Sequence, residues 1–113
     1  MRVRTKRAYE QAEPGDGYRV LVERLWPRGV TKERAHLDEW AKEIAPSPEL
    51  RRWFGHDPAR FEEFRRRYRD ELAPRQEELD ALRRRARNGT LTLVYGARDT
   101  EHNGALVLEE LLR

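Results

Sequence analysis

Short apolar runs alternate along this chain with longer segments whose apolar residues recur every three or four positions. Three of the short runs, residues 3–10, 18–25 and 90–95, are rich in β-branched and aromatic residues and are bounded by turn-forming residues. This pattern is typical of strands. The run 90–95, "TLTLVY" between two glycines, is the clearest of them.

The longer segments have the spacing of amphipathic helices. Ser47 and Asp57 each precede a proline, the usual order of an N-cap followed by the first helical residue, and Gly55 is placed to end the first of these helices. The apolar stripes begin with Phe61 and Phe64 in the second helix. The predicted helices cover residues 47–55, 57–72, 74–89 and 102–112.

Strands near both ends of the chain, with helices between and after them, predict an α/β fold. The sequence contains no hairpin dipeptide, so we expect a small, mostly parallel sheet of few strands covered by helices. The length of 113 residues is that of a single domain, which we take as residues 1–113. The pattern leaves segment 36–45 open between a helix and an edge strand.

Composition excludes several classes of protein. Cysteine is absent, which excludes disulfides, thiolate metal sites and cysteine nucleophiles. No run approaches the roughly 18 apolar residues of a membrane span, and residues 1–10 lack the apolar core of a signal peptide. We therefore expect a cytoplasmic protein. The net charge of +3, from 24 basic and 21 acidic residues, indicates a mixed surface.

Two loops carry the candidate chemistry, because parallel sheets bind ligands beyond the carboxyl ends of their strands. The first loop follows strand 20–25 and offers Arg24, Trp26 and Arg28. The second, residues 96–103, follows strand 90–95 and enters the last helix, whose first turn favours anions. Its candidate residues, with the last residue of the strand, are Tyr95, Asp99, His102 and Asn103.

The same residues also have structural interpretations. Arg24 and Arg28 could pair with Asp38, Glu39 or other surface acids, and Trp26 could fill the core. In the second loop, Asp99 or Thr100 is placed to act as the N-cap of the last helix.

A nucleic-acid or protein-binding module is the alternative to a small-ligand site. The runs "RRRYR" and "RRRAR" are the densest basic segments. Helical spacing distributes these arginines around the helix among many acids, which favours ion pairs on a solvated face over a stripe that binds phosphates. The chain also has no zinc-finger spacing or other recognition motif.

Three motifs identify a family resemblance. The segments "DGYRVLVERLWPRGV", "EWAKEIAPSPELRRWF" and "LTLVYGARDTEHNGALVL" resemble the YeaO-like branch of the domain of unknown function 488 family, in the same order and over nearly the whole chain. The family's motif positions fall on Asp16, Gly17, Arg24, Trp26, Pro27, Arg28, Gly29, Trp40, Pro46, Ser47, Leu50, Trp53, Tyr95, Asp99, His102 and Asn103.

The resemblance implies a site but no assigned activity. Other members carry a cysteine in the last loop that suggests anion-cradling sites of the phosphatase or rhodanese kind, whereas this chain has Tyr95 at the strand end. We expect a small anionic, phosphate-bearing ligand, held by Arg24 and Arg28, and no cofactor or metal. Asp99 would orient an arginine or cap the helix. An enzymatic version, as a hydrolase or lyase, would use His102 or Tyr95 for proton transfer; ligand identity and oligomeric state stay open.

Overall fold

A computed structural model describes residues 1–113, and its centre is a four-stranded sheet. The strands are β1 (Arg2–Arg7), β2 (Tyr18–Leu21), β3 (Glu39–Trp40) and β4 (Thr90–Tyr95). Their order is β1-β4-β2-β3, and every neighbouring pair is parallel. The predicted α/β fold is confirmed. The most apolar strand, β4, lies between β1 and β2, and its residues are buried on both faces because other segments cover both sides of the sheet.

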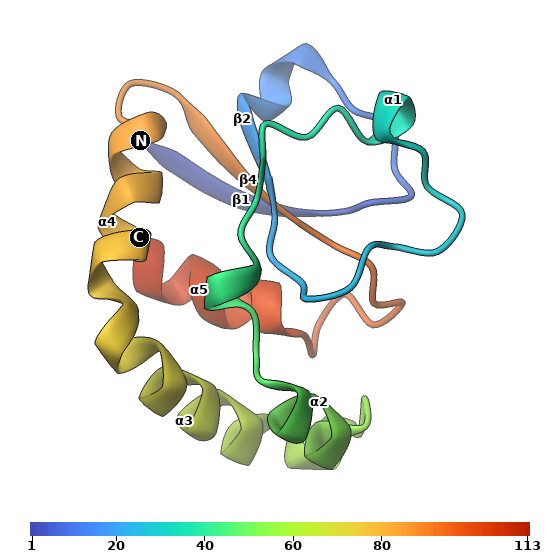
Figure 1. Ribbon diagram of the computed structural model, residues 1–113, viewed down its shortest axis with the longest axis vertical. Helices are drawn as coiled ribbons and strands as arrows, with labels where there is room; N and C mark the ends of the chain where they lie inside the picture. Colours follow the sequence, from blue (N-terminus) through green and yellow to red (C-terminus); the bar gives the residue numbers. More distant parts are fainter.

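Most helices cover one face of this sheet. Figure 1 shows α5 (Gly104–Leu112) against the strands, with α2 (Pro48–Phe54) and α3 (Phe61–Leu72) on the far side of α5. The helix α4 (Gln76–Arg85) leads back to the start of β4. The short α1 (Lys32–Ala35) lies on the opposite side of the sheet.

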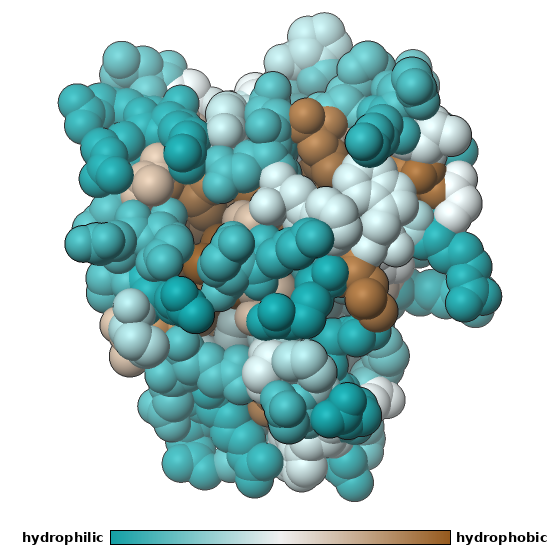
Figure 2. Space-filling view, viewed as in Figure 1, coloured by the Kyte–Doolittle hydropathy of each residue, from teal (hydrophilic) through white to brown (hydrophobic).

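The main core fills the space between the sheet and α2 to α5. The predicted stripe of α3 is buried, and Tyr68 is fully inaccessible. Ser47 accepts a hydrogen bond from the Leu50 N–H, as expected of an N-cap, and Gly55 ends α2 in the left-handed region. Leu79 and Leu82 of α4 also point inward. Figure 2 shows that hydrophobic residues on the outer surface form small separate patches on this face.

A buried cluster of charged residues lies on the other face of the sheet, the face that α1 covers. Asp16, in the turn Pro14–Asp16, accepts hydrogen bonds from Lys6 Nζ at 3.1 Å and Arg19 Nη1 at 2.7 Å, and all three residues are buried. Arg19 also donates to the Ala35 carbonyl at the end of α1. Because burial penalises unpaired charge, this cluster ties the turn and α1 to the sheet.

Several element boundaries differ from the sequence prediction. The first strand ends at Arg7, not at residue 10, and α4 ends at Arg85, not at residue 89. The second strand ends at Leu21, not at residue 25. The last backbone hydrogen bond between this segment and β4 runs from the Val22 N–H to the Val94 carbonyl, and β4 ends one residue later, at Tyr95. Arg24 and Trp26 therefore lie in a loop. Segment 36–45 contains the short edge strand β3 and then a 3-10 turn, Lys42–Ile44, so the extended alternative holds.

The last helix begins later than predicted. It starts at Gly104, and its N-cap is Asn103, whose side-chain oxygen accepts a hydrogen bond from the Leu106 N–H. The prediction that Asp99 or Thr100 caps this helix is wrong. Asp99 instead accepts from the N–H groups of Glu101 and His102, which closes a separate turn before the helix.

Candidate functional site

The carboxyl ends of β2 and β4 lie side by side, as the sequence predicted. Leu21 pairs with Val94, so the loop that follows β2 and the loop that follows β4 leave the same edge of the sheet. The two loops are joined directly, because a carboxylate oxygen of Glu23 accepts a hydrogen bond from the Gly96 N–H. A shared site at this edge is therefore geometrically available.

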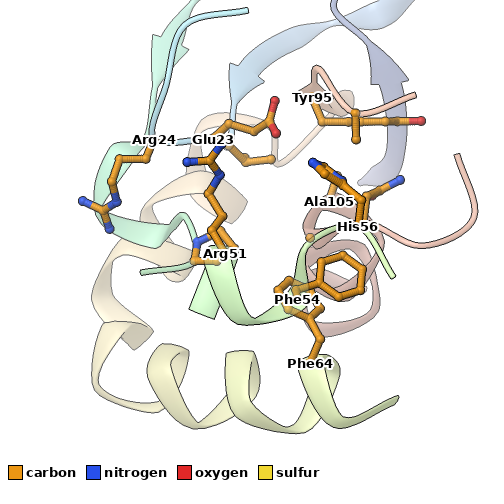
Figure 3. Close-up of a pocket in the computed structure, with 13 residues that line it drawn as sticks. Glu23, Arg24, Arg51, Phe54, His56, Phe64, Tyr95 and Ala105 are labelled. Carbon is orange, nitrogen blue, oxygen red and sulfur yellow. The ribbon is translucent and has the colours of Figure 1, made fainter. Parts of the chain in front are cut away.

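A small pocket of about 50 Å³ opens where these loops meet α2 and α5 (Figure 3). Phe54, Phe64 and other apolar side chains form its inner wall. Its polar lining brings together residues predicted in the two loops: Arg24 from the first, and Tyr95 and Asn103 from the second. It also contains three residues that the sequence prediction missed, Glu23, Arg51 and His56.

Arg24 has none of the acidic partners that the structural interpretation required. It is half-buried, its Nε is buried without a hydrogen-bond partner, and no carboxylate lies within 4.0 Å of it. Asp38 instead accepts from the Arg19 N–H and Glu39 pairs with Arg85. In Figure 3 the Arg24 guanidinium turns away from Tyr95 and His56, so only part of this side chain faces the pocket.

Arg28 and Trp26 line a second, more open groove beside the pocket. Arg28 is exposed, and its carbonyl accepts a hydrogen bond from the Tyr9 hydroxyl. The Trp26 ring donates to the Val30 carbonyl at 2.6 Å and packs edge-on against Trp40. The groove has a volume of about 270 Å³ and shares four residues with the pocket: Glu23, Arg51, His56 and Ala97.

The floor of the pocket is formed by the end of β4 and the start of α5. Tyr95 is buried, and its burial raises the pKa of its hydroxyl above the usual value. Asn103 caps α5, and its side-chain amide donates to the Asp99 carbonyl. Gly104 and Ala105, the first two residues of the helix, also line the pocket. Their N–H groups have no acceptor within the helix, which makes this end of the pocket favourable for an anion.

Asp99 and His102 do not line the pocket. The His102 Nδ1 lies 2.9 Å from a carboxylate oxygen of Asp99, and the His102 ring packs edge-on against Phe61. The Glu101 N–H, together with His102, holds the pKa of Asp99 below its usual value. Asp99 therefore neither orients an arginine nor caps α5: it pairs with the imidazole one turn away.

Glu23 is the most unusual polar group of the pocket. It is half-buried, and burial raises the pKa of its carboxyl although the Gly96 N–H, Arg51 and His56 act in the opposite direction. Its other carboxylate oxygen has no hydrogen-bond partner in the protein. Glu23 lies next to Arg24 in the first motif, so its place in the sequence was a usable signal. No such signal existed for Arg51 and His56, which reach the pocket only through the packing of α2.

No group of three or more His, Cys, Asp and Glu side chains is arranged to hold a metal ion. None of the helices combines the length and the apolar character needed to cross a membrane.

The fold and the pocket define a class: a small α/β protein with an all-parallel sheet and a pocket of apolar and charged residues beyond the carboxyl ends of its two central strands. Within it, the chain belongs to the DUF488 family, because the family model described as "Inactive DUF488-N3 subclade" matches residues 2–113. The resemblance inferred from the three motifs is thereby confirmed.

Relatives of this chain align over nearly their whole lengths. One is "Uncharacterized protein YeaO" of Escherichia coli (strain K12), 48% identical over 113 residues that cover 100% of this chain and 98% of that protein. Another is "Uncharacterized protein Rv3073c" of Mycobacterium tuberculosis (strain ATCC 25618 / H37Rv), 43% identical over 111 residues that cover 98% and 93% of the two chains. No solved structure matches the chain.

Proposed function

We propose that this protein binds a small anionic, phosphate-bearing ligand in the pocket between β2, β4, α2 and α5, and that it does so without turnover. The observation that carries the proposal is that Arg24 and Arg51 both line one pocket and neither has a carboxylate within 4.0 Å. An arginine without an acidic partner keeps its full capacity to bind an oxyanion. The first turn of α5 adds to the same positive environment.

Binding without chemistry is favoured by the lining of the pocket. It contains no serine, threonine, cysteine or lysine that could act as a nucleophile. Of the two proton-transfer candidates of the enzymatic alternative, His102 lies outside the pocket and pairs with Asp99. Tyr95 lines the pocket, but burial raises the pKa of its hydroxyl, which disfavours its ionised form as a base. The description of the matching family as an inactive subclade supports the same interpretation.

The arginine-rich helices give less support to a nucleic-acid function. Every arginine of the run "RRRYR" is paired with an acid: Arg65 and Arg69 with Glu110, and Arg66 and Arg67 with Glu63. In the second run, Arg83 pairs with Asp80 and Arg85 with Glu39, so that only Arg84 and Arg87 have no acidic partner. Arginines held by neighbouring acids offer little clustered charge to a phosphate backbone.

Changing either pocket arginine is expected to weaken anion binding. Arg51→Gln should lower the affinity for sulfate about tenfold, because losing one charge-assisted hydrogen bond costs about 1.5 kcal/mol. Arg24→Gln should lower it less, because the Arg24 guanidinium turns away from Tyr95 and His56 (Figure 3). Arg28→Gln should change it less than about threefold, because Arg28 lines only the outer groove and not the pocket. The measurement is isothermal titration calorimetry with sulfate at pH 7, with thermal melting to show that each variant is folded.

Arg52→Gln is the matched control, since Arg52 lies next to Arg51 on α2, is exposed, and does not line the pocket. It should leave sulfate binding unchanged. Equal losses for Arg51→Gln and Arg52→Gln would show that sulfate responds to overall charge, and the proposal would then be abandoned. Binding that disappears only when arginines of α3 or α4 are changed would move the site to those helices.

A further inference from the structure

An acid and a base face the same pocket without touching each other. Glu23 and Arg51 line both the pocket and the adjoining groove. The charge of Arg51 acts on the Glu23 carboxyl, yet the two groups lie farther apart than the 4.0 Å of an ion pair. In Figure 3 the Arg51 side chain extends from α2 toward Glu23. Many acidic and basic side chains of this protein form ion pairs, whereas Glu23 and Arg51 do not pair with each other.

Only one of the two carboxylate oxygens of Glu23 accepts a hydrogen bond from the protein. The hydrogen bond from the Gly96 N–H anchors one of its oxygens to the loop after β4. The second oxygen has no partner in the protein and belongs to a side chain that lines the pocket. An ionised carboxylate is only an acceptor, so whatever meets this oxygen must donate a hydrogen bond.

Glu23 also changes what kind of anion the pocket can hold. A bare oxyanion bound to Arg51 would lie close to a negative carboxylate, and like charges within a few ångströms disfavour each other. A donor group on the same ligand, placed against the Glu23 oxygen, replaces that repulsion with a charge-assisted hydrogen bond. The arrangement therefore discriminates between anions that carry such a donor and those that do not.

The dimensions favour a small head group. The pocket, about 50 Å³, has room for about three or four water molecules. It opens into the groove of about 270 Å³ at the residues that include Glu23, Arg51 and His56. A ligand can thus place its charged head at this junction while the remainder extends along the groove.

We propose that Glu23 is the specificity-determining residue of this site, and that the ligand carries a hydrogen-bond donor, a hydroxyl or an ammonium group, next to the anionic group that Arg51 binds. This inference rests on the proposed function of the pocket and names the chemistry of its ligand. In this proposal Glu23 accepts a hydrogen bond from the donor group and Arg51 binds the anionic group. The ligand thereby bridges two side chains that do not contact each other.

The test compares three probes in the wild-type protein and in Glu23→Gln. The probes are methyl phosphate, whose dianion has no hydrogen-bond donor at about pH 8, glycerol 3-phosphate, which adds hydroxyl groups, and phosphoethanolamine, which adds an ammonium group. Wild type should bind at least one of the latter two esters about tenfold to a hundredfold more tightly than methyl phosphate. Glu23→Gln keeps an acceptor oxygen for the Gly96 N–H but loses the charge. It should reduce this preference to less than about threefold and bind methyl phosphate at least as tightly as wild type does.

Glu49→Gln is the matched control, because Glu49 is an exposed acid of α2 that does not line the pocket. It should preserve the wild-type preference, and thermal melting should show all variants folded. The preferred ester identifies the donor as hydroxyl or ammonium. Equal affinities for the three probes in wild type, or a preference that Glu23→Gln leaves intact, would overturn the role of Glu23 while leaving anion binding in place. Failure of wild type to bind any probe would overturn the proposed function itself.

Discussion

Asp16→Asn is expected to lower the free energy of unfolding by about 3–5 kcal/mol, because the change leaves two buried cations without their shared anion. Asp16 is 1% exposed, and the side chains of Lys6 and Arg19 that contact it are each 4% exposed. Asn can accept one of these hydrogen bonds, but it carries no charge to balance the pair. Thermal or urea unfolding measures the loss, which corresponds to a drop in Tm of at least about 10 °C.

Asp80→Asn serves as the comparison, since the Asp80–Arg83 pair has the same chemistry on the surface. It should cost less than about 1 kcal/mol. A loss of similar size in both variants would show that the buried cluster contributes no more than an exposed ion pair, contrary to the expectation.

The same cluster predicts how stability depends on acid. Burial alone would raise the pKa of Asp16, but hydrogen bonds from the Glu13 N–H, Lys6 and Arg19 outweigh burial and hold the pKa below its ordinary value of 3.8. A lowered folded-state pKa gives stability that is fully present above the ordinary value and is lost as the pH falls below it. Asp16→Asn should therefore remove part of the acid sensitivity that wild type shows below about pH 4.

Gly17→Ala is the second change with a large expected effect, about 2–5 kcal/mol of lost stability. Gly17 has φ +64°, a conformation that costs a residue with a Cβ about 1–2 kcal/mol. A Cβ at this position would also lie 2.3 Å from the backbone oxygen of Thr90, at the start of β4. Because that oxygen belongs to the central strand, the clash must separate β2 from β4 and adds an overpacking cost of about 1–3 kcal/mol.

Gly15→Ala provides the control two residues earlier in the same turn. A Cβ on Gly15 would have no atom within 4 Å, and its backbone is not left-handed. We expect this variant to unfold within about 0.5 kcal/mol of wild type. If Gly17→Ala were equally neutral by urea unfolding, the close approach of β2 and β4 at this point would be wrong.

Local signals in the sequence were enough to predict the elements and their class. The N-cap and proline at Ser47–Pro48, and the stripe that begins with Phe61, act within one or two helical turns, so neighbouring residues carry the whole signal. The same is true of β4, in which Leu91, Leu93, Val94 and Tyr95 are apolar and buried, as expected of a strand covered on both faces. These elements and the absence of a hairpin predicted a parallel sheet in which the carboxyl ends of β2 and β4 lie at the same edge.

Only the tertiary structure decided which side chains share the site. The end of β2 depends on where its partner β4 ends, so Arg24 lies in a loop and not in the strand. In the same loop, Glu23 accepts a hydrogen bond from the Gly96 N–H. The packing of α2 against the sheet edge added Arg51 and His56 to the pocket, although about 30 residues of sequence separate them from Glu23.

The sequence by itself thus determined the fold class and the edge of the sheet where chemistry is concentrated, because periodicity and capping are local. It predicted local ion pairs within the arginine-rich helices, but not the partners of the charged groups near the site or in the buried cluster. Asp99 meets His102 instead of an arginine, Arg24 meets no acid, and Asp16 holds both Arg19 and Lys6, which is 10 residues away in the sequence. Ion pairs form between whichever charges packing brings within a few ångströms, and their free energy depends on burial, which is a property of the folded chain.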